Sequence, residues 1–234
     1  MGSRSLDVER IARTIDVLCR RVETRFPDSG LARVCRDLDE IARRTAETTA
    51  WIARPILPLR VAVGLLVALI LAGLGVTAVS LRPAVGPLPL HELVQTLEAG
   101  VNDLIFVAIG IFFLVTLESR IKRRRALAAI QELRSIAHVI DMHQLTKDPE
   151  WVLDRGRETG VLPPRQMGRF ELSRYLDYCT EALSLTGKVA AVYIQGFTDP
   201  VALQAVNEVE DLTTGLARKI WQKLMILYAM GPEA

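Results

Sequence analysis

The chain has 234 residues, of which 50% are hydrophobic and 24% are charged, and its formal net charge is +2. Its mean hydropathy is positive, so it is more apolar than an ordinary soluble domain. The balance of 29 basic against 27 acidic residues argues against a global basic surface of the kind that binds nucleic acid. The three cysteines are scattered, which excludes a disulfide framework and a CxxC metal site.

The N-terminal part of the chain carries two stretches of helical periodicity, separated by the sequence FPDSG. Apolar residues recur at helical spacing over residues 11–22 and again over residues 31–41. Asp28 or Ser29 would cap the second helix. The pattern therefore predicts a helical hairpin over residues 1–56.

The first long apolar stretch covers residues 61–81 and contains no charged residue. About 20 apolar residues cross the roughly 30 Å hydrocarbon core of a bilayer, because a helix rises 1.5 Å per residue. Soluble core helices rarely stay apolar on all faces over this length, so a transmembrane helix is expected. Small residues at helical spacing would let this helix pack closely against the second span or against another subunit: Gly64, Ala68 and Ala72.

A second apolar stretch covers residues 104–117, which alone is short for a transmembrane helix. Extension back to about residue 97 gives a full span if three polar residues lie at the outer interface or face protein. In a symmetric oligomer these residues would form an acidic ring at the outer mouth of a cation pore, and otherwise they lie among hydrated headgroups. They are Glu98, Asn102 and Asp103.

A dense group of cations follows the second stretch and is called the basic collar here: Arg120, Lys122, Arg123, Arg124 and Arg125. The loop between the two stretches has a single Arg, so the positive-inside rule places the collar in the cytoplasm and the loop outside. Both termini are then cytoplasmic, and the protein belongs to the cell's inner membrane. The collar would also contact anionic lipid. It has no interleaved aromatic residues, so binding to nucleic acid is not expected.

Helical periodicity continues beyond the collar and predicts a cytoplasmic stalk over residues 119–145. The segment 146–234 completes the chain, and an irregular stretch rich in Gly and Pro over 141–168 precedes its helices. Two amphipathic helices follow and should pack antiparallel. Asp199 is expected to cap the last helix, with Pro200 at its first position.

Sequence signatures of catalysis are missing. The sequence SLTGK resembles the end of a phosphate-binding loop but lacks the upstream glycine and the preceding strand. Neither GxSxG, HExxH nor a glycine-rich dinucleotide loop occurs. His138, Asp141 and His143 are weak metal-ligand candidates, because the two histidines point about 140° apart on a continuous helix. Helix capping and packing are the expected roles of these three residues, and no cofactor is expected.

Together these patterns predict an all-α membrane protein. A two-span transmembrane hairpin over residues 57–118, with spans at 61–81 and about 97–117, would carry a cytoplasmic helical bundle formed by the N- and C-terminal segments. We expect a homo-oligomeric, non-enzymatic interaction or regulatory protein that contacts membrane lipid and acts through its cytoplasmic helices on a protein partner. The alternative is a small ion channel or transport component lined by the second span.

Overall fold

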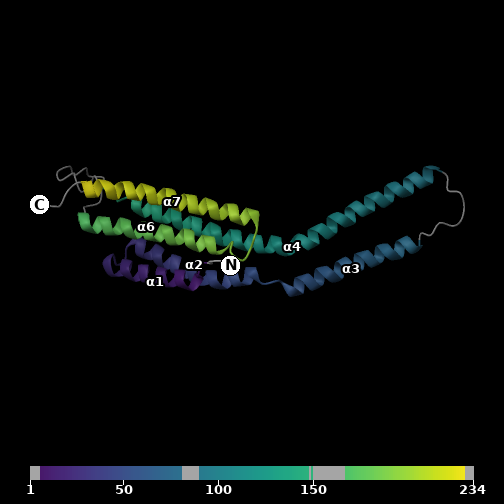
Figure 1. Ribbon diagram of the computed structural model, residues 1–234, viewed down its shortest axis with the longest axis horizontal. Coiled ribbons are helices and arrows are strands. Elements are labelled where there is room, and N and C mark those ends of the chain that lie inside the picture. Colours follow the sequence, from purple (N-terminus) through teal and green to yellow (C-terminus); the bar gives the residue numbers. More distant parts are fainter. Residues whose placement is uncertain (1–5, 81–89, 148, 150–166, 230–234) are drawn as a thin grey trace, which may run out of the picture. The chain divides into compact units, whose positions relative to one another are not determined.

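The computed structural model describes residues 6–80, 90–147, 149 and 167–229, and the regular structure in these ranges is entirely helical (Figure 1). The prediction of an all-helical protein is therefore confirmed for this part of the chain. The helices are α1 (Val8–Arg25), α2 (Gly30–Ala53), α3 (Leu57–Ser80), α4 (Leu90–Leu145), α6 (Arg169–Val192) and α7 (Pro200–Ala229).

The chain divides into two compact units, which are described separately. The first unit combines residues 1–53 with 125–234, and the second covers 54–124. Helix α4 contributes to both units, because it runs without a break over 56 residues. The predicted continuation of the second apolar stretch as one long helix is confirmed.

Three helices of the first unit are capped at their N-termini by short polar side chains. The carboxylate of Asp7 accepts a hydrogen bond of 3.1 Å from a backbone N–H three residues later, at the start of α1. Of the two predicted caps for α2, Ser29 is the one whose side chain accepts a backbone N–H, also at 3.1 Å. Asp199 accepts the N–H groups of the two residues after Pro200, so the predicted start of α7 is confirmed.

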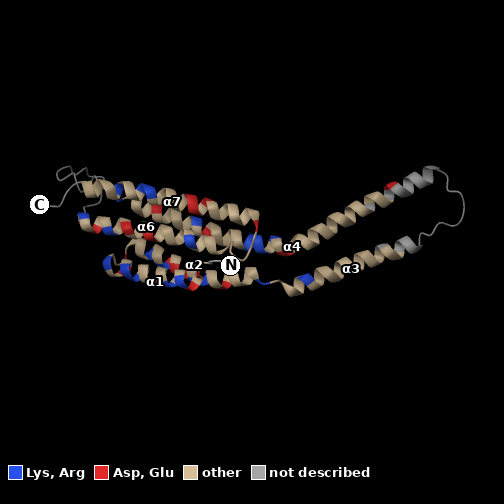
Figure 2. Cartoon of the chain, in the orientation of Figure 1, with Lys and Arg blue, Asp and Glu red and all other residues tan. Residues whose placement is uncertain are grey.

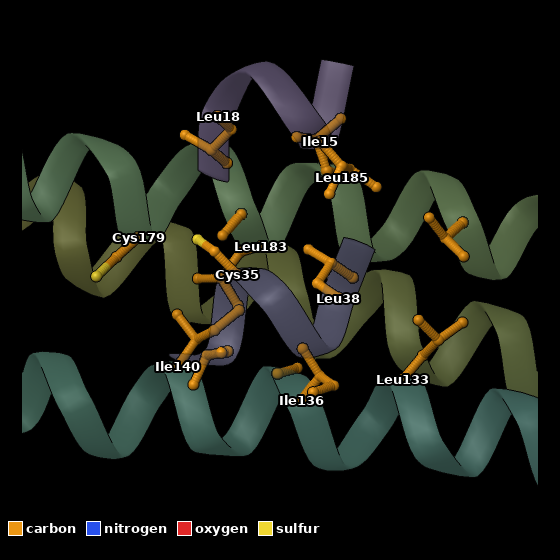
Figure 3. Close-up of a cluster of buried hydrophobic side chains, with 14 of the residues drawn as sticks. Ile15, Leu18, Cys35, Leu38, Leu133, Ile136, Ile140, Cys179, Leu183 and Leu185 are labelled. Atoms are coloured by element: carbon orange, nitrogen blue, oxygen red, sulfur yellow. The ribbon is translucent and has the colours of Figure 1, made fainter. Parts of the chain in front are cut away.

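The first unit is a bundle with one apolar core, to which five helices contribute. Each provides at least one side chain with 0% exposure: Ile15 of α1, Leu38 of α2, Leu133 of α4, Leu183 of α6 and Ile220 of α7. Figure 3 shows side chains from α1, α2, α4 and α6 meeting in this core. Complete burial of one such side chain is worth roughly 2 kcal/mol, so the core is the main stabilising element of this unit.

Helices α6 and α7 are antiparallel neighbours, as the sequence predicts. Arg169, at the start of α6, donates a hydrogen bond to the carbonyl oxygen of Leu227 near the end of α7. Midway along α7, the hydroxyl of Thr213 lies beside Gly187 of α6, where an added Cβ would come within 3.2 Å of it. An alanine at position 187 would therefore require the side chain of Thr213 to shift by a few tenths of an ångström.

Helix α4 ends at Leu145, where the predicted stalk ends, so irregular structure does not begin at residue 141. At this end of the helix the ammonium group of Lys223 donates to the carbonyl oxygens of Gln144 at 2.9 Å and Lys147 at 3.2 Å. The backbone N–H of Lys147 also donates to the carbonyl oxygen of Gln144 at 3.0 Å, so the ammonium group is a second donor at the C-terminus of the helix. Most of the remaining predicted irregular stretch lies outside the described residues.

The second unit contains α3 and the first part of α4, and both helices are long and apolar enough to cross a membrane. Their apolar side chains are exposed, with Leu69 at 69% and Phe106 at 72%. Figure 2 shows charged residues of both signs along the helices of the first unit, while the described residues of α3 and of the first part of α4 are mostly uncharged. Such apolar surfaces are unfavourable in water.

Candidate functional site

Glu118 lies at the centre of an ion-pair cluster that joins the start of α3 to α4. Its carboxylate accepts hydrogen bonds from Nε of Arg60 at 2.5 Å and from Nζ of Lys122 at 2.8 Å. The backbone N–H of Ile56 donates to the same carboxylate at 3.3 Å. We call these groups the Glu118 cluster. The carboxylate of Glu118 thus connects the start of α3 with the part of α4 that follows the second apolar stretch.

The electrostatics of the Glu118 cluster favour the charged form of its carboxylate. The hydrogen bonds from Arg60 and Lys122 lower the pKa of Glu118 to about 2, against a smaller opposing effect of burial. Only 7% of Lys122 is exposed, so its ammonium group depends on Glu118 for its partner. Hydrogen bonds between ionised groups are about twice as strong as neutral ones, so the cluster is a structural anchor.

The cations of the basic collar do not share one environment. Lys122 points into the Glu118 cluster, and Arg123 is half-buried. The guanidinium of Arg125, which belongs to the first unit, lies over the ring of Trp51 at 4.4 Å from its centroid. Arg120 and Arg124 are exposed. The cations of the basic collar lie close together in sequence but therefore have different environments in the structure.

The predicted acidic ring is described in part. Glu98 and Asn102 are exposed on α4, as a pore-lining or headgroup position requires. The side chain of Asp103 lies outside what the structure describes. A ring at an outer mouth remains a prediction.

The small residues of α3 are not packed against another helix at the position where this can be assessed. Gly64, Ala68 and Ala72 are exposed, and a Cβ added at Gly64 would meet no atom within 4 Å among the residues described. This surface is open to lipid or to another chain.

The three weak metal-ligand candidates have different surroundings. His138 is exposed, whereas Asp141 accepts a hydrogen bond of 2.6 Å from the side chain of Gln144. The ring of His143 lies so close to Gly30 that a Cβ there would collide with it. Burial lowers the pKa of His143, with a further contribution from neighbouring cations. In the described ranges no three His, Cys, Asp or Glu residues gather as a metal site.

All three cysteines are free and buried, and the surroundings of Cys19 and Cys179 oppose reactivity. Sγ of Cys19 lies 2.9 Å from the carbonyl oxygen of Cys35, and the pKa of the Cys19 thiol is raised, mainly by its contact with Cys35 and by burial. Burial raises the pKa of Cys179 to about 12. A thiol that stays protonated is neither a nucleophile nor a good metal ligand.

Glu118 is not among the site residues that the sequence pattern predicts. A usable signal was present, because Glu118 and Lys122 are four residues apart and therefore face one another on a helix. The partner from α3, Arg60, could not be paired with them from sequence, because it stands 58 positions away. Comparison of the chain with protein-family models, with curated proteins and with solved structures finds no match, so its function has to be argued from its own residues.

Proposed function

We propose that this chain is a two-pass protein of the cell's inner membrane whose helices α3 and α4 cross the bilayer, with both termini in the cytoplasm. In this proposal it is a homo-oligomeric, non-enzymatic interaction or regulatory protein that acts through its cytoplasmic helices. The observation that carries the proposal is the contrast between the two units. One has a closed apolar core of its own, whereas the other exposes apolar side chains along two helices.

The exposed surface of α3 and α4 supports membrane insertion. The side chains on this surface include Leu69, Phe106 and Phe112, which are 65–72% exposed. Leaving such a side chain in water costs roughly 25 cal/mol per Å² of its apolar area. A helix satisfies its own backbone hydrogen bonds, which a segment in lipid must do. The chain should therefore stay in the membrane fraction after alkaline carbonate washing and dissolve only in detergent. Release into the carbonate supernatant would refute the proposal.

The orientation can be tested with single cysteines and an impermeant thiol reagent on intact cells. Gly86→Cys, in the connecting loop outside the described residues, should react from outside the cell. Asn207→Cys, exposed on α7, should react only after the membrane is opened. Native Cys179 is a poor probe because it is fully buried and would be protected on either side. Labelling of Asn207→Cys in intact cells would show that the orientation is the opposite of the proposed one.

The bundle offers a surface through which the chain could assemble. Trp221, Met225 and Tyr228 follow one another at helical spacing on α7 and are 59%, 49% and 57% exposed. Large apolar and aromatic side chains at such exposure are typical of protein interfaces. The double substitution of Trp221 and Met225 by Ala should lower the mass of the detergent-solubilised protein, whereas Gln222→Ala should not. Equal masses for both variants would remove α7 from the assembly.

A second candidate function is a small ion channel lined by α4. The exposed polar side chains of Glu98 and Asn102 favour it, since carboxylates at an outer mouth attract cations. The cations of the basic collar oppose it, because positive charge at the inner end of a pore hinders cation exit.

A further inference from the structure

We propose that Arg120 and Arg124 form a binding site for the phosphate of an anionic phospholipid, whose acyl chain lies along the apolar residues that precede them on α4. The inference rests on the proposed membrane insertion of this helix. Residues four apart lie one above the other on a helix, so the two guanidinium groups share a face. The same face carries the residues that we call the α4 stripe: Phe106, Ile109 and Phe113.

The guanidinium of Arg120 is held in place before any ligand arrives. Its Nε donates to the hydroxyl of Thr116 at 3.3 Å, and its Cζ lies 4.9 Å from the centroid of the Phe113 ring. A guanidinium has five N–H donors in a planar fork, and the bond to Thr116 uses one of them. The fork matches the oxygen spacing of a phosphate, which can be bound in bidentate fashion.

The acidic residue closest to these arginines in sequence is committed elsewhere. Glu118 is two positions before Arg120, which places it about half a turn away on α4. Its carboxylate is bound by Arg60 and Lys122. The collar thus includes one cation that anchors α3 to α4, Lys122, and two exposed cations whose charge Glu118 does not neutralise, Arg120 and Arg124.

The α4 stripe has the dimensions that an acyl chain needs. Phe106, Ile109 and Phe113 are 72%, 60% and 48% exposed. From Ile109 to Arg120 the helix rises about 16 Å, close to half of the roughly 30 Å hydrocarbon core. A lipid whose phosphate lies at Arg120 and Arg124 would therefore place its chain beside Ile109 and Phe113 within one leaflet.

The test is a lipid titration of the purified full-length chain in detergent, read by native mass spectrometry. Phosphatidylglycerol and phosphatidylcholine with identical acyl chains are compared. Wild-type protein should prefer the anionic lipid, and the Arg120→Gln/Arg124→Gln variant should lose this preference by about tenfold or more, since two charge-assisted contacts disappear. The control Arg10→Gln/Arg13→Gln removes the same charge from the exposed face of α1 and should behave as wild type. A Gln variant with the wild-type preference, or a control that loses it equally, would overturn the proposal.

Two further variants distinguish a built site from general attraction of charges. Arg120→Lys/Arg124→Lys keeps both charges but lacks the planar fork, so it should bind the anionic lipid more weakly than wild type; equal binding would refute the bidentate geometry. Phe113→Ala removes part of the stripe and the ring beneath Arg120 and should also weaken binding. Inorganic phosphate at millimolar concentration should leave the lipid bound, and displacement by it would assign the site to free phosphate instead.

The outcome also separates this inference from the proposed function. A chain that carbonate releases from membranes fails the proposed function itself. A chain that stays in the membrane, but whose Gln variant keeps its lipid preference, fails only the lipid site.

Discussion

Replacing Glu118 with Gln should destabilise the protein, because the substitution keeps the shape of the side chain and removes its charge. Two cations then face an amide instead of a carboxylate. Lys122 is the more affected, since its side chain is 9% exposed and has little access to water. Arg60, at 59% exposure, can turn to solvent.

The two partners therefore contribute unequally. The pair with Arg60 is screened by solvent and contributes less. Leaving the buried ammonium of Lys122 without an anion costs about 2 kcal/mol, within the usual range for a charged hydrogen bond. A loss of about 2 kcal/mol corresponds to a fall in Tm of about 4–8 °C for a chain of this size.

Thermal unfolding of the detergent-solubilised chain, followed by circular dichroism, measures this loss. The matched control is Glu40→Gln, because Glu40 is 72% exposed and lies 3.8 Å from Arg44. Its Tm should stay within about 1–2 °C of wild type. A Glu118→Gln variant that melts with the Glu40→Gln control would show that the Glu118 cluster does not anchor the helices.

The same comparison has a pH dependence of known sign. Because the pKa of Glu118 is lowered to about 2 in the folded chain, its carboxylate stabilises the fold fully above its ordinary pKa of 4.5. That contribution is lost as the pH falls from 4.5 towards 2. The difference in Tm between wild type and Glu118→Gln should therefore shrink over this window, and a constant difference would contradict the assignment.

Four other changes give defined outcomes. Gly30→Ala should cost about 1–3 kcal/mol of unfolding free energy because its Cβ meets the ring of His143, and the cost should vanish in a His143→Ala background when a double-mutant cycle is measured by urea unfolding. Since the pKa of His143 is lowered in the folded chain, stability should fall as the pH drops below 6.5, and the His143→Ala variant should lose this dependence. Leu216→Asp would bury a charge at a position with 5% exposure and should abolish cooperative unfolding and assembly, as judged by circular dichroism and mass. If α4 lines a pore, Glu98→Gln should lower cation flux into proteoliposomes, most strongly at low salt, whereas absence of flux in both proteins would eliminate the channel alternative.

The helices of the bundle were predictable because burial leaves a local signature. A helix that packs one face against a core repeats apolar residues every three or four positions, and the stretches over residues 11–22 and 31–41, which lie in α1 and α2, show this pattern. Asp199 was predicted as a cap because its hydrogen bonds reach only two and three residues ahead. Interactions within one helical turn can be deduced from the order of residues.

Contacts between distant segments could not be deduced in this way. Neither Arg60 with Glu118 nor His143 with Gly30 has a pattern that identifies the partner. The contact of Lys223 with the end of α4 could not be deduced either, because Lys223 comes from another helix, although the predicted stalk ends at the observed residue. The sequence also did not distinguish the cations of the collar from one another. The face of the helix on which each cation lies decides whether it anchors helices or is open to ligands.

Because the first unit is built from both ends of the chain, its core can be completed only late in synthesis. Helices α1 and α2 leave the ribosome first, yet the core that covers their apolar faces includes α4, α6 and α7, which are made after the apolar helix α3. At about 5–20 residues per second, roughly 9–35 s pass between the completion of α2 and that of α7. During that interval Ile15 and Leu38 lack the neighbours that α6 supplies, so α1 and α2 depend on each other, or on a chaperone, for cover. A ribosome stalled within the second unit would leave an open half-bundle that is prone to aggregation.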